Sequence, residues 1–294
     1  MQTKEKIDKI LDVINFSSDL LNQRGIKDAR LNVELLMCHV LNCKRLELYL
    51  NFDKPLNLSE REAFKKLLVR RIANEPLQYI LGETNFYGYK IKVDKRVLIP
   101  RQETEILVEE ILKEFSKKQI HQINILEIGC GSGCITIALA GELKKLNKNF
   151  KILSIDISEG AITLAKENLD LNGLKDVNVK FSQESIFDLK SEIDGIDFLI
   201  SNPPYISENE FNHLEKEVKN FEPKIALTDN EDGFKFYRSI FNMGKNLKKD
   251  SYIFCEISYN GRTEIEKILS LNGFSDYQFI KDLSGIERVL KVKL

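Results

Sequence analysis

The fold class of this chain is decided by residues 124–140, which read NILEIGCGSGCITIALA. A short apolar run comes first, glycines at positions 129, 131 and 133 follow, and an alanine-rich apolar stretch closes the segment. This order predicts a buried strand, a sharp turn and a helix, the unit from which nucleotide-binding α/β sheets are built. Glycine allows positive φ and close approach of the backbone to a ligand, and a helix start favours an anionic group. A tight turn without a ligand is the alternative.

The spacing of the glycines narrows the class of ligand. It is G-x-G-x-G, and Cys134 stands where the dinucleotide fingerprint G-x-G-x-x-G has its third glycine, which argues against NAD or FAD. The next predicted strand ends at Asp156, where a carboxylate can accept hydrogen bonds from both ribose hydroxyls of a nucleoside. Asp156 could instead cap the following helix, although Ser158 can serve that role. We therefore expect a cofactor that contains a nucleoside.

Strand and helix patterns alternate from residue 101 to the end of the chain. The expected strands are 124–128, 151–156, 177–182, 198–201, 252–257, 276–281 and 287–293. They predict an α/β fold with a Rossmann-like, doubly wound sheet of seven strands, mainly parallel and covered on both faces by helices. The link 282–285 is too short for a parallel crossover, so the last strand should be antiparallel.

The first 80 or so residues predict helices only. Apolar spacing of three and four favours helices over 4–21, from about 28 onward and from 59 to 72; Gly25 is expected to cap the first helix, and Ser59 with Glu62 to form the capping box of the third. Between 84 and 99 the period changes to two, which predicts a β-hairpin with Gly88 near its turn. We expect a helical domain at 1–82, a hairpin linker at 83–100 and the α/β domain at 101–294.

Composition limits the kind of partner and the compartment. With 43% hydrophobic and 30% charged residues among 294, the chain has a globular composition, neither disordered nor membrane-embedded. Its 44 basic residues are matched by 45 acidic ones, so direct nucleic-acid binding is not expected; the cluster Lys65, Lys66, Arg70 and Arg71 fits a solvated helix face. Five cysteines without a C-x-x-C pair and three histidines argue against a metal site. The cysteines and the lack of a signal peptide indicate a cytoplasmic protein.

A second motif, Asn202-Pro203-Pro204-Tyr205, follows the predicted strand 198–201. The prolines remove two backbone donors and stiffen the turn, so its carbonyls point outward. We predict that the carbonyl oxygens of the Asn202 side chain and the Pro203 backbone accept the two N–H bonds of a planar nitrogen, an amide or an aromatic amine, while Tyr205 packs on its face. This polarisation and in-line positioning would let the nitrogen attack a methyl group. A rigid loop or a proline-recognition ligand is the alternative.

Both motifs should meet at one crevice, because ligands of open α/β sheets bind at the carboxyl ends of the strands where the strand order reverses. There the methionine part of S-adenosylmethionine (SAM) would lie on the glycine loop, and the adenine in an apolar slot that includes Ile186. Packing is the alternative role of Cys130. The predicted cofactor-binding residues are Glu127, Gly129, Cys130, Gly131, Ser132, Gly133, Asp156, Ile186 and Asn202.

With both motifs in place, the chain resembles the release factor glutamine methyltransferases, the PrmC/HemK family. The resemblance extends over nearly the whole chain and is carried by 75–82 (EPLQYILG), 86–88 (FYG), 98–105 (LIPRQETE), 202–205 (NPPY) and 221–223 (FEP). It implies N5-methylation of the glutamine in the Gly-Gly-Gln motif of class-I peptide chain release factors, with S-adenosyl-L-methionine as the methyl donor and S-adenosyl-L-homocysteine as the product.

The resemblance also implies roles for particular parts of the chain. The N-terminal helical domain would help to dock the release factor, and neither a membrane nor a nucleic acid would be a partner. Catalysis would rest on Asn202, Pro203 and Tyr205, and substrate contacts on these three and Pro204. Arg101 and Glu105 would shape the mouth of the pocket.

The chain departs from the family pattern at a few positions. Ser185 stands where relatives often carry Asp, and Ile186 where some have Trp, so the resemblance does not assign the adenine contacts within residues 185–187. Gln102 replaces a usual Pro.

Three other functions compete with this one. DNA methyltransferases that act on adenine N6 or cytosine N4 use a similar turn, but they need base flipping and a basic surface, against which the near-neutral charge argues. A ribosomal-protein glutamine is another possible acceptor. An idle SAM-binding module is the third alternative.

Overall fold

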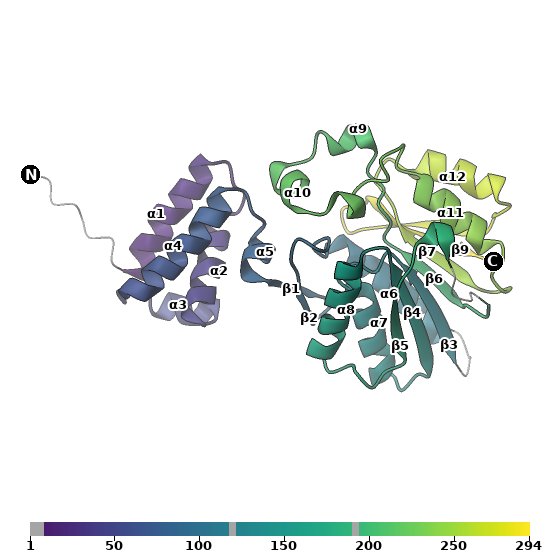
Figure 1. Ribbon diagram of the computed structural model, residues 1–294, viewed down its shortest axis with the longest axis horizontal. Coiled ribbons are helices and arrows are strands. Elements are labelled where there is room, and N and C mark those ends of the chain that lie inside the picture. Colours follow the sequence, from purple (N-terminus) through teal and green to yellow (C-terminus); the bar gives the residue numbers. More distant parts are fainter. Residues whose placement is uncertain (1–8, 118–121, 190–193) are drawn as a thin grey trace, which may run out of the picture. The chain divides into compact units, whose positions relative to one another are not determined.

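The computed structural model describes residues 9–117, 122–189 and 194–294. The chain divides into two compact units, Met1–Gly82 and Glu83–Leu294, and each is described by itself (Figure 1). None of the helices in the described ranges is long and apolar enough to cross a membrane.

The first unit is helical. It consists of α1 (Ile10–Gln23), α2 (Ala29–Leu41), α3 (Arg45–Leu50), α4 (Leu58–Ile72) and α5 (Leu77–Leu81). Apolar side chains from all five helices form its own core, among them Ile14, Leu21, Val33, Leu36, Leu48, Phe64 and Ile80. The unit therefore has a core that is separate from that of the rest of the chain.

Two of these helices have ends for which a cap was expected, Gly25 after the first helix and a capping box of Ser59 and Glu62 at α4. Gly25 ends the first helix at a φ of 74°, as expected, whereas residues 4–8 of the expected helix lie outside the described residues. The expected capping box of Ser59 and Glu62 is wrong. The structure forms it two residues earlier, with Asn57 Oδ1 accepting from Glu60 N at 2.9 Å, because Asn is an equally good cap.

A short hairpin opens the second unit. It pairs β1 (Glu83–Phe86) with β2 (Tyr89–Lys92), and Tyr87 and Gly88 both have positive φ, as a two-residue type I′ turn requires. The hairpin is shorter than the expected range 84–99, since Val93 and Val97 follow it as buried loop residues. It packs on α7 (Cys134–Lys145) through Tyr89 and on α8 (Glu159–Leu171), where Asn168 exchanges hydrogen bonds with the Lys92 backbone.

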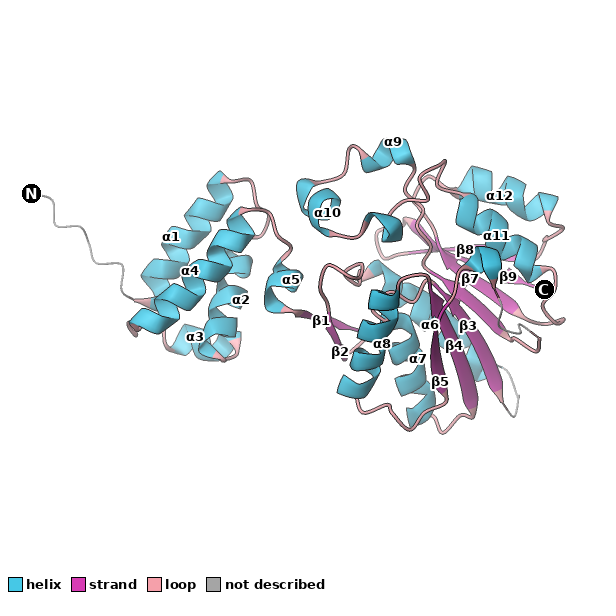
Figure 2. Cartoon of the chain, viewed as in Figure 1, coloured by secondary structure: helices cyan, strands magenta, loops and turns pink. Residues whose placement is uncertain are grey.

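The main sheet of the second unit has seven strands in the order β5-β4-β3-β6-β7-β9-β8 (Figure 2). They are β3 (Ile123–Ile128), β4 (Phe150–Asp156), β5 (Val179–Gln183), β6 (Phe198–Ser201), β7 (Tyr252–Glu256), β8 (Tyr277–Lys281) and β9 (Glu287–Lys293). Neighbours pair in parallel from β5 to β7, and β9 lies antiparallel between β7 and β8. The predicted Rossmann-like sheet with an antiparallel last strand is confirmed.

Helices cover this sheet in two layers (Figure 2). α6 (Glu103–Lys117), α7 and α8 pack in succession as one layer, and α11 (Lys235–Gly244) and α12 (Arg262–Leu271) pack together as the other. The shorter elements of the unit are η1 (Ile186–Asp188), α9 (Glu208–Phe211), α10 (Lys216–Phe221) and η2 (Lys224–Ala226). Because β4 and β6 lie on opposite sides of β3, the strand order reverses there, and a ligand is expected at the carboxyl ends of these strands.

Candidate active site

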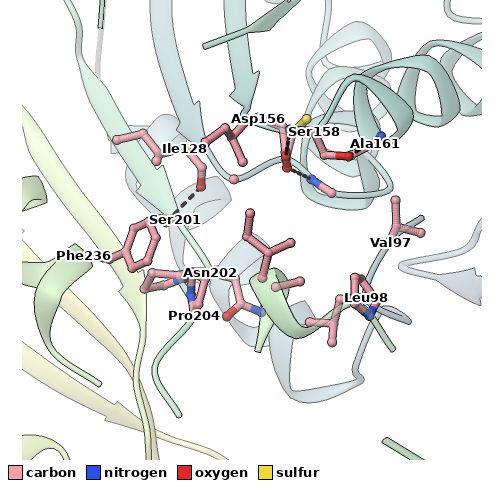
Figure 3. Close-up of a pocket in the computed structure, with 18 of the residues that line it drawn as sticks. Val97, Leu98, Ile128, Asp156, Ser158, Ala161, Ser201, Asn202, Pro204 and Phe236 are labelled. Atoms are coloured by element: carbon pink, nitrogen blue, oxygen red, sulfur yellow. Dashed lines mark hydrogen bonds between the residues drawn. The ribbon is translucent and has the colours of Figure 1, made fainter. Parts of the chain in front are cut away.

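A cavity of about 270 Å³ lies at this reversal point, close to the lower end of the size range for small-molecule pockets (Figure 3). Its walls combine the glycine loop after β3, the end of β4, η1, the turn after β6 and the segment around η2. The predicted residues in its walls are Arg101, Gly129, Cys130, Gly131, Ser132, Asp156, Ile186, Asn202, Pro203 and Pro204. Four predicted residues, Glu105, Glu127, Gly133 and Tyr205, lie outside the walls.

The glycine loop closes on the neighbouring strand. The N–H groups of Gly129 and Cys130 both donate to the carbonyl of Ile155, at 2.8 and 3.0 Å. These two N–H groups are therefore not available to an anion, although Gly129 and Cys130 both line the cavity. Gly133 has a φ of 79°, and a Cβ there would come within 3.0 Å of the Ala165 Cβ, so the loop packs tightly on α8.

Asp156 is held at the end of β4 by backbone donors. Its Oδ2 accepts from Gly131 N and its Oδ1 from Ser158 N, both at 2.9 Å. Ser158, not Asp156, caps α8, since its hydroxyl accepts from Ala161 N. Each carboxylate oxygen keeps a second lone pair, so both can still accept a ribose hydroxyl. Burial raises the pKa of Asp156.

Glu127, the residue before Ile128 at the end of β3, is buried beneath the loop. Its Oε2 accepts from the hydroxyls of Thr136 and Ser154. Its other oxygen, Oε1, has no hydrogen-bond partner within the described part of the chain. Among the described residues it is the one buried side-chain nitrogen or oxygen atom of which this is true. Burial raises the pKa of this carboxyl to about 7.

These features fit SAM. The Asp156 carboxylate suits a ribose, and Ile186 and its neighbours supply an apolar slot. The buried Glu127 Oε1 beneath the glycine loop remains without a hydrogen-bond partner among the described residues. Phe187, half exposed beside Ile186, pairs with Phe236 at a centroid distance of 5.4 Å. Sequence reasoning missed Phe236 because it lies on α11, far along the chain.

The turn after β6 presents Asn202 to the cavity (Figure 3). Ser201 anchors the strand end, since its hydroxyl donates to the Ile128 carbonyl at 2.9 Å. The Asn202 Nδ2 donates to Thr104 Oγ1 at 3.2 Å. Within the described residues, no donor reaches Asn202 Oδ1 or the Pro203 carbonyl oxygen. Two acceptors on one stiff turn are thus available to a ligand.

Tyr205 takes a different place from the one expected. Its ring packs against the core beneath α11, and its hydroxyl donates to Glu256 Oε1 at 3.1 Å. Burial, followed by the neighbouring Glu256 carboxyl, raises the pKa of Tyr205. The ring therefore supports the turn from behind, while the walls beside Asn202 are formed by other residues.

The two residues expected at the mouth of the pocket, Arg101 and Glu105, lie in different places. Arg101 lines the cavity and its Nη2 pairs with Glu222 Oε1 at 2.5 Å, while Glu222 Oε2 accepts from Ile99 N. Glu105 lies elsewhere, because its carboxylate accepts from Tyr87 N at the hairpin turn at 2.7 Å. Glu105 therefore does not lie at the mouth of the pocket, where it was expected.

A loop that sequence reasoning missed, residues 227–233, supports the turn from its other end. Ile206 N donates to the Leu227 carbonyl at 3.0 Å, and Glu208 N to the Glu231 carbonyl. Asp229 holds this loop by accepting from Gly233 N. No local motif marked the loop, since its partners are backbone atoms more than twenty positions away.

Comparison with known proteins agrees with this geometry. Residues 12–82 match a family model described as the PrmC N-terminal domain, and residues 121–279 match one described as a methyltransferase domain. The release factor glutamine methyltransferase of Fusobacterium nucleatum is 38% identical over 294 residues, which covers 99% of this chain and 81% of that protein. That of Chlorobaculum tepidum is 35% identical and covers 98% of each.

Solved structures show the same fold at low sequence identity. The hMettl16 catalytic domain in complex with a 3′UTR hairpin has a TM-score of 0.54 and 15% identity, and the match covers 83% of this chain and 84% of that one.

Proposed function

This chain belongs to the release factor glutamine methyltransferase family, and from that premise we propose that it methylates the side-chain amide nitrogen (N5) of a glutamine in a peptide chain release factor. It is a SAM-dependent methyltransferase. The proposed acceptor is the glutamine of the Gly-Gly-Gln motif of class-I release factors. The observation that carries the choice of a planar nitrogen is the pair of unused acceptors, Asn202 Oδ1 and the Pro203 carbonyl oxygen, in the wall of the cofactor cavity.

The residues of the cavity would orient the two reactants. SAM, when bound, supplies a methyl group on a sulfonium centre and becomes S-adenosylhomocysteine. Asp156 would accept the ribose hydroxyls, and the glycine loop (residues 129–132) and the side chain of Ile186 would bound the space for the methionine and nucleoside parts. This arrangement fixes the direction from which the acceptor nitrogen must approach.

At the acceptor, Asn202 Oδ1 and the Pro203 carbonyl take the two amide hydrogens of the glutamine. An amide nitrogen is a poor nucleophile because its lone pair is delocalised, and accepting its hydrogens raises its electron density. Once the nitrogen–carbon bond has formed, the nitrogen is acidic and gives up a proton to Asn202 Oδ1 or to water. A strong general base is not needed.

The remaining parts of the proposal concern the partner and the compartment. The helical unit, which matches the PrmC N-terminal domain, would help to dock the release factor. We further propose a cytoplasmic location, which the free, unpaired state of all five cysteines supports.

One transfer assay tests the proposed acceptor. Methyl-labelled SAM is offered with a class-I release factor, with the same factor carrying Ala in place of the Gly-Gly-Gln glutamine, and with duplex DNA. We expect label on the unaltered factor alone. Label on the DNA would refute the proposal. Equal label on the release factor with and without the Ala replacement would refute it as well.

A further inference from the structure

The side-chain amide of Asn202 has an acceptor end and a donor end of nearly the same shape. Only the acceptor end, Oδ1, can take a hydrogen from the substrate amide. With the amide turned over, Nδ2 would face the acceptor nitrogen and oppose a donor with a donor. Something in the protein must therefore decide which end faces the cavity.

A chain of hydrogen bonds reaches Asn202 from inside the protein. Asn202 Nδ2 donates to Thr104 Oγ1 at 3.2 Å, and Thr104 Oγ1 donates to Glu256 Oε2 at 2.6 Å. Tyr205 donates to the other oxygen, Glu256 Oε1, at 3.1 Å. Thr104 is 2% exposed and Glu256 3% exposed, so water does not compete for these bonds.

The number of hydrogens sets the direction of this chain. A threonine hydroxyl has one hydrogen, and Thr104 can receive from Asn202 only while it gives that hydrogen to Glu256. Both oxygens of Glu256 then act as acceptors, one for Thr104 and one for Tyr205. If Glu256 offered a donor toward Thr104, the hydroxyl would point its hydrogen at Asn202, and the amide would turn over.

The fold places the acid there without any obvious packing benefit. Tyr252, Phe254 and Glu256 alternate on the face of β7 that meets α6, so the acid takes the last position of an otherwise aromatic face. Thr104 is the second residue of α6. Among the ion pairs of residues 9–117, 122–189 and 194–294, Glu256 has none, and burying a carboxyl without one is costly. An apolar side chain would have packed at lower cost.

We propose that Glu256 is a positioning residue that, through Thr104, holds the Asn202 amide with Oδ1 toward the acceptor nitrogen. This inference rests on the proposed function, since it explains how that site presents its acceptor. It assigns Thr104, which lines the cavity, and Glu256, which lies behind it, a role in turnover rather than in cofactor binding.

Two replacements test this chain of hydrogen bonds. Thr104→Val keeps the shape of the side chain and removes both hydrogen bonds, and Glu256→Met keeps the length of the side chain and removes both acceptor oxygens. We expect each to lower kcat on the release factor roughly 10- to 100-fold while the Kd for SAM changes less than about threefold. Thr104→Ser, which keeps the hydroxyl, should recover most of the lost kcat.

The double variant tests whether Glu256 acts through Thr104. We expect Thr104→Val with Glu256→Met to have a kcat close to that of Thr104→Val alone, since the second change removes a partner that is already disconnected. Losses that multiply would contradict the relay. Should Thr104→Val fail to bind SAM, Glu256→Met decides: a kcat of Glu256→Met equal to that of the wild type overturns the inference.

A matched control separates positioning from general destabilisation. Ser251 is buried just before the opposite end of β7, and its hydroxyl donates to the Ile196 carbonyl at 2.8 Å. Ser251→Ala should lower Tm and leave kcat within about twofold of the wild type. A kcat loss as large as that of Thr104→Val would overturn the inference. If the wild type does not methylate the release factor, the proposed function fails; if it does and Thr104→Val keeps full kcat, only the relay fails.

Discussion

Asn202 owes its place to two kinds of constraint that act on different atoms. The strand end, tied by Ser201 to the Ile128 carbonyl, fixes its backbone, and Thr104 fixes the side-chain amide. The side-chain oxygen, Oδ1, has no partner among the described residues and is the atom proposed to accept a hydrogen from the substrate amide. A change at Asn202 should therefore affect turnover much more than cofactor binding.

For Asn202→Ala we expect a fall in kcat of about 100- to 1,000-fold, because an acceptor that acts in the transition state is lost. The Kd for SAM, measured by calorimetry, should rise by less than about tenfold. Equal losses in turnover and in SAM affinity would show that Asn202 serves the cofactor alone.

Glu127 makes stability depend on pH. Its pKa is about 7 in the folded protein and 4.5 is its ordinary value, so between these limits the folded state holds the proton more firmly than the unfolded state. The stabilisation is fully present below about pH 4.5 and is lost as the pH rises through 7, on the order of 3 kcal/mol in total.

Glu127→Gln should remove this dependence, since an amide does not titrate. Both proteins are unfolded with urea, without SAM, at several pH values from 5 to 8. As the pH rises, the free energy of unfolding of the wild type should fall relative to that of Glu127→Gln. Parallel curves for the two proteins would mean that Glu127 is ionised throughout.

At the residue scale, sequence reasoning found the groups that carry recognisable chemistry. Asp156 and Asn202 stand at strand ends beside glycines or prolines, and both line the cavity. Thr104 and Glu256 were missed because their partners are 98 and 152 positions away, and neither residue has a local motif. Glu105 was misplaced because its partner is a backbone N–H of the hairpin turn, which no spacing rule reveals.

Among the elements, long ones with regular patterns were predicted well and short ones poorly. The seven strands were each found within a few residues, and the central ones, β3 and β6, are buried parallel strands whose sequences are largely apolar runs. The one-turn helices α3 and α5 were missed, because five or six residues are too few to show a helical period. Asn57 and Ser59 offer rival caps for α4, and the sequence alone does not rank them.

The loop 227–233 and the turn at Asn202 should behave as one element. Gly233 has a φ of 86°, and a Cβ there would lie 2.6 Å from the Tyr205 carbonyl oxygen. Gly233→Ala is therefore expected to push the turn out of place, lowering kcat at least about tenfold and destabilising the protein by about 2 kcal/mol.

Gly173 provides the matched control for this change. Its φ is 68°, and a Cβ there would meet nothing within 4 Å. Gly173→Ala should cost about 1 to 2 kcal/mol of stability, measured by urea unfolding, with unchanged kcat. If Gly233→Ala keeps wild-type kcat, the loop does not support the turn.

At the scale of the whole molecule, the two units have separate cores and are expected to divide the work. Removing Met1–Gly82 leaves the cavity and its walls intact, since all of its lining residues belong to the second unit. We expect the truncated protein to bind SAM with a Kd within about threefold of that of the full chain. Its KM for the intact release factor should rise at least about tenfold, because a docking surface is lost.

A short Gly-Gly-Gln peptide serves as the control for the truncated protein. It is too small to use a separate docking surface, so the full chain and the truncated protein should methylate it with similar kcat/KM. A truncated protein that handles the intact factor as well as the full chain does would remove the docking role from the helical unit.

The protein should transfer its methyl group to one glutamine nitrogen of the release factor. Tandem mass spectrometry of a class-I release factor after incubation with this protein and SAM tests it most directly. The account predicts one added methyl group, located on the side-chain nitrogen of the Gly-Gly-Gln glutamine, and none when Asn202→Ala replaces the wild type. A methyl group on any other residue, or an unmodified glutamine after full incubation, would contradict it.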